Sequence, residues 1–370
     1  MAIRMIESQP PTASAYDAPP DHPRVEGSAS GHSVPRHRAS GLQGARSTHS
    51  HISPLAQCLA LVGDDLHASE QHLREMLDSS VPAVSAIGHY LADAGGKRIR
   101  PLLTGLSARA AGHTGDISRL MCAGELLHLG SLLHDDVVDQ ANDRRGRPAA
   151  HIAHGNAGVI LTGDVCLARS VQVAAEEGGH KAVLALTRVV AEMSEGEVIQ
   201  LLNRNNLALP RAVYDDIIER KSAALISWCA AAGGWAADNA EAVDGLTKFG
   251  RAVGIAFQIT DDVLDYAGNE SLTGKNVGRD LVERKVTLPL ILAFERDPGL
   301  AEAIAQSTDA PEEIRALVQR VIDTDAPMRA LAVARAHVAE GIAALHQGTP
   351  ASPYRRALEA LAHHLVDRVK

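Results

Sequence analysis

The 370-residue chain has very few aromatic residues, since two Trp, five Tyr and three Phe make up only 3% of it. A large core cannot be built around so few rings. It must instead be assembled from Ala, Leu, Val and Ile, and apolar residues do account for 45% of the chain. Ala and Leu are strong helix formers. The composition therefore favours a mainly helical protein with an aliphatic interior.

The chain also lacks an excess of positive charge and a paired-cysteine motif. Its 36 Lys and Arg residues face 45 Asp and Glu residues, which leaves a net charge of −9. This balance excludes nucleic-acid binding by bulk charge, because neutralising phosphates needs a basic face. The four cysteines are scattered and form no CxxC pair. They indicate buried thiols in a reducing, cytoplasmic compartment, not a disulfide framework or a zinc site.

Long hydrophobic runs are missing as well. The Ala- and Gly-rich run Ser222–Ala237 has 16 residues, fewer than the roughly 20 apolar residues that a membrane-spanning helix needs. We expect no transmembrane segment, and a buried helix broken at Gly233-Gly234. Residues 1–52 are rich in Ser, Pro, His, Gly and Arg and predict a disordered N-terminal extension. Residues 53–370 are expected to form the single folded domain.

Apolar residues in that domain recur at helical spacing, beginning with Leu55, Leu59, Val62 and Leu66. The same pattern predicts helices over 119–139, 181–202, 212–232, 244–266, 281–296, 312–323 and 327–346. Gly- and Pro-containing turns such as 111–115 and 207–210 separate them. The fold class predicted is therefore all-α, a large helical bundle around a central cavity.

The first chemical signal is a cluster of aspartates, Asp135, Asp136 and Asp139, after a leucine-rich helix. Asp135 and Asp139 are four residues apart and share one face of a helix. Such carboxylates repel one another unless a cation lies between them. An acidic last turn facing solvent is the alternative, although acidic residues are unfavourable at a helix C-terminus.

A second cluster has the same spacing 126 residues later, with Asp261, Asp262 and Asp265. Two matched carboxylate turns suggest facing helices that hold divalent cations and a polyanion between them. Oxygen ligands are those that Mg²⁺ prefers, with phosphate oxygens completing its coordination. Basic residues surround both clusters, and Arg and Lys are the usual partners of diphosphates.

Together these motifs identify a family. The chain resembles the trans-isoprenyl diphosphate synthases, or polyprenyl synthetases, of the longer-chain type, from about Leu55 to the C-terminus. The resemblance rests on GGKRIRP (95–101), ELLHLGSLLHDDVVD (125–139), RRGRP (144–148), GDVCLARS (163–170), EGEVIQL (195–201), KSA (221–223), FQITDDVLD (257–265), GKNVGRDL (274–281) and ERKVTLP (283–289). It implies an enzyme that condenses an allylic diphosphate with isopentenyl diphosphate head to tail.

The resemblance also implies residue roles. The expected catalytic residues are Asp135, Asp136, Asp139, Asp261, Asp262 and Lys221. The expected ligands of several Mg²⁺ ions are Asp135, Asp139, Asp261 and Asp265. The residues expected to bind the allylic diphosphate are Arg144, Lys221, Ser222, Lys275 and Lys285. Those expected to bind isopentenyl diphosphate are Lys97, Arg100, His128 and Arg145. Gln258 is expected to steady the developing cation or the second substrate. A homodimer is implied by the family.

Small residues upstream of Asp135 suggest the product length. In the family, bulky aromatics four and five residues before this aspartate stop growth at farnesyl, whereas Ser131 and Gly130 stand here, with Leu127 one turn deeper. The expected product is therefore geranylgeranyl diphosphate or longer. The alternative is that Gly130 and Ser131 only allow close helix packing.

Three other functions remain open. A class I terpene cyclase shares the helical fold, but it stabilises carbocations on aromatic faces, and this chain has few. A non-catalytic partner subunit of a heteromeric synthase would be expected to lack some of the aspartates. A catalytic subunit that needs a partner is consistent with the motifs.

Overall fold

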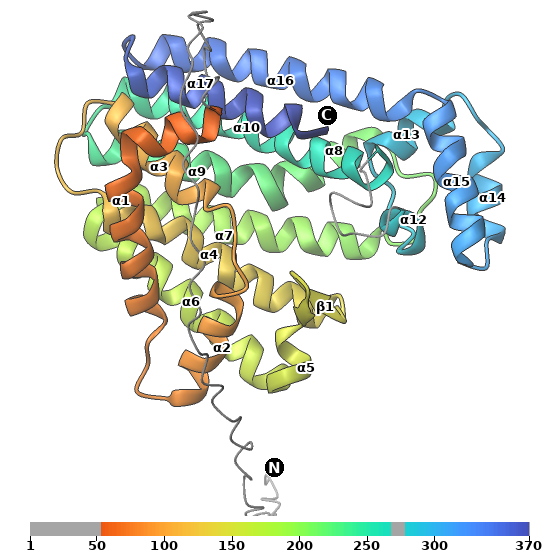
Figure 1. Cartoon of the computed structure of the whole chain (residues 1–370), viewed down its shortest axis with the longest axis horizontal. Helices are drawn as coiled ribbons and strands as arrows, with labels where there is room; N and C mark the ends of the chain where they lie inside the picture. The colour runs from red at the N-terminus through yellow and green to blue at the C-terminus, as the bar shows by residue number, and fades with distance from the viewer. Residues whose placement is uncertain (1–52, 268–277, 370) are drawn as a thin grey trace, which may run out of the picture. The chain divides into compact units, whose positions relative to one another are not determined.

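The computed structural model describes residues 53–267 and 278–369, so the predicted tail and Lys275 lie outside the described residues. Within them the chain is helical apart from one short hairpin, which confirms the all-α class (Figure 1). The elements are α1 Pro54–Leu77, α2 Pro82–Ala92, α3 Ile99–Ala110, α4 Ser118–Val138, β1 Asp143–Arg144, β2 Arg147–Pro148, α5 Ala150–His154, α6 Asn156–Glu177, α7 Gly179–Leu202, α8 Arg211–Ile218, the π-helical turn η1 Glu219–Ala223, α9 Ala224–Ala236, α10 Ala240–Ala267, α12 Arg279–Val282, α13 Leu288–Phe294, α14 Leu300–Gln306, α15 Pro311–Asp323, α16 Ala326–Gly348, α17 Pro353–Val366 and the 3₁₀ turn η2 Asp367–Val369.

Local sequence signals explain several helix starts. Ser53 accepts a hydrogen bond from the Ala56 N–H at 3.2 Å, directly before Pro54 at the start of α1. Ser352 does the same for the Arg355 N–H at 3.1 Å, at the start of α17. A hydroxyl at the cap satisfies an N–H that has no partner within the helix, and proline is tolerated in the first turn.

Two predicted helices are divided in the structure. The range 212–232 contains α8, η1 and α9. The range 281–296 contains α12 and α13, which are separated by a turn at residues 283–284 and three further non-helical residues. Periodicity alone does not reveal a π-helical turn, because the apolar pattern continues through it. The other predicted helices agree with α4, α7, α10, α15 and α16 to within a few residues.

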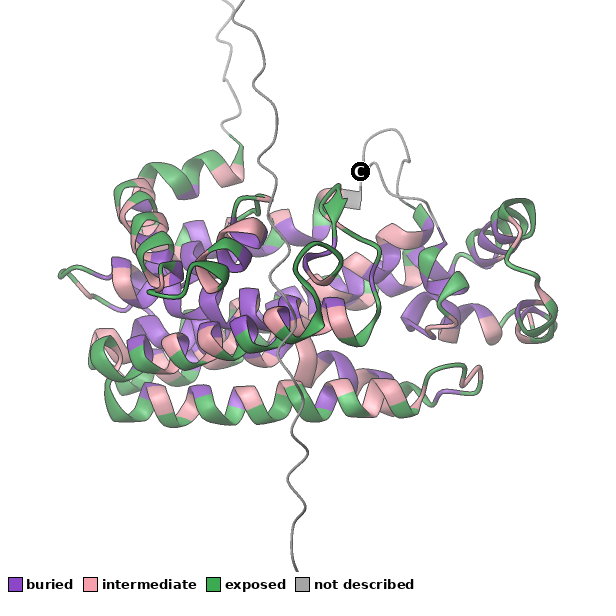
Figure 2. Ribbon diagram, turned by 90° about the horizontal axis from the view of Figure 1, so that it is seen from below, coloured by how far each residue is buried: buried purple, intermediate pink, exposed green. Residues whose placement is uncertain are grey.

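The core is built around α9, which packs against α3, α7 and α10, while α16 runs along α10 (Figure 1). Buried residues lie on the inner faces of these helices, and exposed residues lie on the outer faces (Figure 2). The predicted break at Gly233-Gly234 was wrong, because α9 continues to Ala236. A Cβ at Gly233 would lie 2.2 Å from the backbone N of Ala108. This glycine therefore permits close contact between α9 and α3.

Helix α6 is an exception to the sequence-based expectation about membranes. Among the helices of the described ranges, it alone is long and apolar enough to cross a bilayer by length and composition, and 39% of that apolar window is buried. It packs against α4 and α7. Since core helices pass the same test, this one helix is weak evidence for a membrane span.

Candidate active site

The first aspartate cluster lies at the C-terminal end of α4, where its members point in different directions. Asp136 is buried and accepts hydrogen bonds from Arg144 of the β1–β2 hairpin, at 2.7 Å from Nε and 2.6 Å from Nη2. Asp139 forms an ion pair with Arg204. The Asp135 carboxylate has no hydrogen bond or ion pair to another described residue, although the Asp135 carbonyl accepts the Asp139 N–H at 2.8 Å. Burial raises the pKa of Asp135 to about 6, although the charge of Lys221 opposes this shift.

The second cluster lies near the C-terminal end of α10 and shows the same division. Asp262 is buried and accepts hydrogen bonds from Tyr214 Oη at 2.7 Å and from Gln258 Nε2 at 2.9 Å. Asp261 is half-buried and lies 2.8 Å from Arg368. Asp265 accepts the backbone N–H groups of residues 279 and 280 at 3.1 and 2.9 Å, which caps the short helix α12. Burial raises the pKa values of both Asp262 and Asp265.

Two predicted cations lie beside these carboxylates. Lys221 projects from the π-helical turn and forms an ion pair with Glu197 of α7. Lys285 lies 3.8 Å from Asp280, and the carboxylates of Asp280 and Asp262 raise the pKa of its ammonium. Lys285 is therefore charged at neutral pH. A π-helical turn inside helical structure is often found at functional sites.

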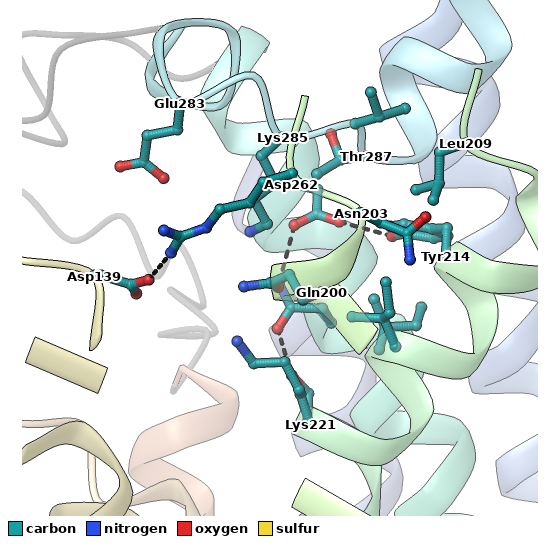
Figure 3. A pocket seen from close by; sticks show the side chains of 16 residues that line it. Asp139, Gln200, Asn203, Leu209, Tyr214, Lys221, Asp262, Glu283, Lys285 and Thr287 are labelled. Carbon is teal, nitrogen blue, oxygen red and sulfur yellow. Dashed lines mark hydrogen bonds and ion pairs between the residues drawn. The ribbon is translucent and has the colours of Figure 1, made fainter. Parts of the chain in front are cut away.

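A cavity of about 350 Å³ brings the two clusters together (Figure 3). Asp139 lines it from the first cluster and Asp262 from the second. The other residues that line it are Gln200, Asn203, Arg204, Leu209, Tyr214, Ile217, Ile218, Lys221, Ser222, Gln258, Glu283, Lys285, Val286 and Thr287. The Ser222 hydroxyl donates to Gln258 Oε1 at 2.6 Å, so a hydrogen-bonded chain runs from Ser222 through Gln258 and Asp262 to Tyr214.

Three of the residues predicted to bind the second substrate form a separate basic cluster. Burial, reinforced by the charges of Arg100 and Arg145, lowers the pKa of His128 well below its usual value. Arg100, His128 and Arg145 are thus close in space, but none of them lines the 350 Å³ cavity. Lys97, the fourth predicted residue, follows the turn at Gly95, where φ is +87°.

The hairpin explains how Arg145 reaches this cluster. Asp143 pairs with Pro148 and Arg144 with Arg147, which leaves a two-residue turn of Arg145 and Gly146. Their φ values are +54° and +75°, the signs that a type I′ turn requires. The hairpin therefore directs Arg144 to the buried Asp136, and it carries Arg145 at the tip of its turn.

The three residues predicted to set the product length lie in different surroundings. A Cβ at Gly130 would lie 2.9 Å from the carbonyl oxygen of Gly163 in α6, so Gly130 permits the close crossing of α4 and α6. Leu127 is buried in the core. Ser131 is half-buried, and its hydroxyl donates to the His128 carbonyl at 2.9 Å. Their role in product length stays a prediction for all three residues.

Several site residues were missed by sequence reasoning. Tyr214 lies 48 residues before its partner Asp262, and no spacing rule connects them. Arg98 donates to Glu70 and to the buried Glu125, with 3.0 Å between Nη1 and the Glu125 carboxylate. Its place within GGKRIRP was visible in the sequence, but its inward direction depends on a φ of +48°.

The comparisons with known proteins agree with this site. A model of the polyprenyl synthetase family matches residues 81–321. The chain belongs to the polyprenyl synthetase family. This family member is 37% identical to the octaprenyl diphosphate synthase of Haemophilus influenzae over 318 residues, which cover 83% of this chain and 95% of that protein. It is 36% identical to heptaprenyl diphosphate synthase component 2 of Geobacillus stearothermophilus over 315 residues, 84% of this chain and 97% of that one.

A solved structure is equally similar. The polyprenyl synthase from Caulobacter crescentus CB15, in a crystal structure with calcium and isoprenyl diphosphate, superposes with a TM-score of 0.81 at 36% identity. The match covers 86% of this chain and 99% of that one. This polyprenyl synthetase is therefore a trans-prenyltransferase of the longer-chain type.

Proposed function

We propose that the enzyme condenses an allylic diphosphate with isopentenyl diphosphate, head to tail, in one or more rounds. The product is a trans-polyprenyl diphosphate of geranylgeranyl length or longer. The observation that carries this proposal is the shared cavity, lined by Asp139 of the first cluster and Asp262 of the second together with Lys221 and Lys285. Carboxylates and ammonium groups arranged in this way suit a diphosphate accompanied by divalent cations.

The donor set fits magnesium. Asp135, Asp139, Asp261 and Asp265 would hold the ions through carboxylate oxygens alone. Among the described residues, no three His, Cys, Asp or Glu side chains form a ready-made ion site. This agrees with Mg²⁺, which usually keeps several waters and takes one or two carboxylates plus substrate phosphates. When bound, the ions would neutralise charge on the departing diphosphate.

The side chains around the cavity would position the first substrate. Lys221 and Lys285 bind its diphosphate and stabilise the charge that grows as the allylic C–O bond breaks. Asp262, held by Tyr214, accepts the Gln258 N–H, while Gln258 Oε1 accepts the Ser222 hydroxyl. These two hydrogen bonds fix the orientation of the Gln258 amide at the cavity wall. Asp136 and Asp262 are buried, and we assign them positioning roles in place of the predicted catalytic ones.

The basic cluster would hold isopentenyl diphosphate. Lys97, Arg100 and Arg145 supply charge, and His128, neutral at pH 7, donates one N–H. Electrons of the alkene form the new C–C bond to the allylic carbon, whose C–O bond electrons leave with the diphosphate. A proton is then lost to the departing diphosphate, which restores an alkene. Placing two reactants together in this way contributes on the order of 7–11 kcal/mol.

Incubation of the purified chain alone tests this function. With farnesyl diphosphate, isopentenyl diphosphate and Mg²⁺, mass spectrometry should detect prenyl diphosphates of 20 carbons or more, and a chelator should abolish them. Formation of cyclic hydrocarbons would favour a terpene cyclase instead. Absence of product from the chain alone would favour a subunit of a heteromeric synthase, as the name of the Geobacillus relative suggests.

We also propose a homodimer in the cytoplasm. Neighbouring helices α6 and α7 carry five exposed large apolar side chains: Ile160, Leu161, Leu184, Val198 and Leu202. Exposed apolar side chains gathered on two packed helices are typical of a protein interface. All four cysteines are free and buried, which agrees with a reducing compartment. Analytical ultracentrifugation should give twice the chain mass for the wild type and a lower mass for Leu161→Asp.

A further inference from the structure

The cations that line the 350 Å³ cavity are already matched by carboxylates. Lys221 pairs with Glu197, Lys285 lies near Asp280, and Arg204 pairs with Asp139. Lys221 and Lys285 belong to motifs that carry the family resemblance, and Arg204 belongs to none of them. Its position at the cavity and its pairing with a predicted metal ligand give it a role that the motifs do not supply.

The Arg204 guanidinium is held only at one point. Arg204 follows the end of α7 and reaches Asp139, the last residue of the α4 motif, and the two side chains are 44% and 36% exposed. The guanidinium has no other hydrogen bond or ion pair to a described residue. Exposed ion pairs of this kind contribute little stability. Arg204 can therefore exchange partners at low cost.

Arg368, which pairs with Asp261 in the second cluster, is fixed much more firmly. Its Nε donates to the Leu365 carbonyl at 2.7 Å, and its guanidinium carbon lies 4.4 Å from the centre of the Phe257 ring. Movement of Arg368 would break these contacts as well as the ion pair. Three arginines pair with cluster aspartates: Arg144, Arg204 and Arg368. Of these three, only Arg204 lines the cavity.

We propose that Arg204 is a further diphosphate-binding residue, which pairs with Asp139 before the substrate binds and moves to the diphosphate when a divalent cation binds the Asp139 carboxylate. This inference rests on the proposed function. Neutralising Asp139 removes the attraction that holds the guanidinium, which remains beside Lys221 and Lys285 in the same cavity. A planar guanidinium binds two phosphate oxygens at once and is well suited to that exchange.

Two binding measurements on Arg204→Gln test the proposal. Binding of inorganic diphosphate in the presence of Mg²⁺, followed by calorimetry, should weaken roughly tenfold, as expected for a lost charge-assisted contact. Binding of Mn²⁺ alone, followed by electron paramagnetic resonance, should tighten by roughly threefold because a competing cation has been removed from Asp139. A merely structural role would not move these two affinities in opposite directions.

Matched variants complete the test. Arg211→Gln removes a similarly exposed guanidinium that pairs with Asp215 and does not line the cavity, and it should leave both affinities unchanged. Arg204→Lys should keep part of the diphosphate affinity. Unchanged diphosphate binding in Arg204→Gln, or weaker Mn²⁺ binding in that variant, would overturn the inference about Arg204. The proposed site itself would still be supported if the wild type binds magnesium diphosphate. Failure of the wild type to bind magnesium diphosphate would overturn both.

Discussion

The buried ion pair between Arg98 and Glu125 should contribute far more to stability than a surface pair of the same length. The Glu125 and Arg98 side chains are 3% and 13% exposed, and 3.0 Å separates their charged atoms. Glu125→Gln keeps the shape but removes the carboxylate charge. Hydrogen bonds to charged groups contribute about 1.5–3 kcal/mol, and Arg98 keeps its second partner, Glu70. We therefore expect the free energy of unfolding to fall by about 2 kcal/mol.

The control has the same geometry at the surface. Arg119 and Glu176 also lie 3.0 Å apart, but their side chains are 40% and 43% exposed. Glu176→Gln should cost less than about 0.5 kcal/mol, because exposed pairs are screened by water. Urea unfolding followed by circular dichroism measures both changes. Equal losses in the two variants would refute the reasoning that burial of the Arg98–Glu125 pair determines its contribution.

Three further predictions concern packing, product length and the buried aspartate. Gly130→Ala should lower the free energy of unfolding by about 1–3 kcal/mol, because the added Cβ would meet the backbone of α6. Gly63→Ala is the control, since a Cβ there meets nothing within 4 Å. Equal effects of the two substitutions in urea unfolding would contradict this prediction. Ser131→Phe should shorten the longest product found by mass spectrometry without abolishing the first condensation, and an unchanged distribution would exclude Ser131 from length control. Tyr214→Phe removes the donor to buried Asp262 and should cost about 1–3 kcal/mol, which a wild-type unfolding curve would disprove.

The aspartate clusters could be predicted because helical spacing is a local property. Asp135 and Asp139 are four residues apart at the end of α4, and Asp136 is buried whereas Asp135 is half-buried and Asp139 is exposed. Their meeting with the second cluster depends on α4 and α10 facing each other. That arrangement was inferred from the repetition of the motif, and Asp139 and Asp262 do line one cavity.

Other features depend on tertiary contacts that spacing does not encode. A glycine at position 130 is compatible both with an open channel for the product and with close helix packing. Only the position of α6 shows that the missing side chain of Gly130 permits close packing. Arg204 and Tyr214 acquire their partners because α7 and α8 end beside the clusters. The π-helical turn that directs Lys221 into the cavity lies within an uninterrupted helical pattern. None of these has a local signature.

The central claim is that the two aspartate clusters act together on a diphosphate. Its most direct test is the turnover of Asp135→Asn and Asp261→Asn with farnesyl diphosphate, isopentenyl diphosphate and Mg²⁺. The control is Asp244→Asn, because Asp244 is an exposed aspartate of α10 that pairs with Lys248. Each cluster variant should fold normally and lose roughly 10²–10³-fold in turnover, as expected when transition-state charge is no longer stabilised, while Asp244→Asn stays at the wild-type rate. Wild-type turnover in either folded cluster variant would contradict the account.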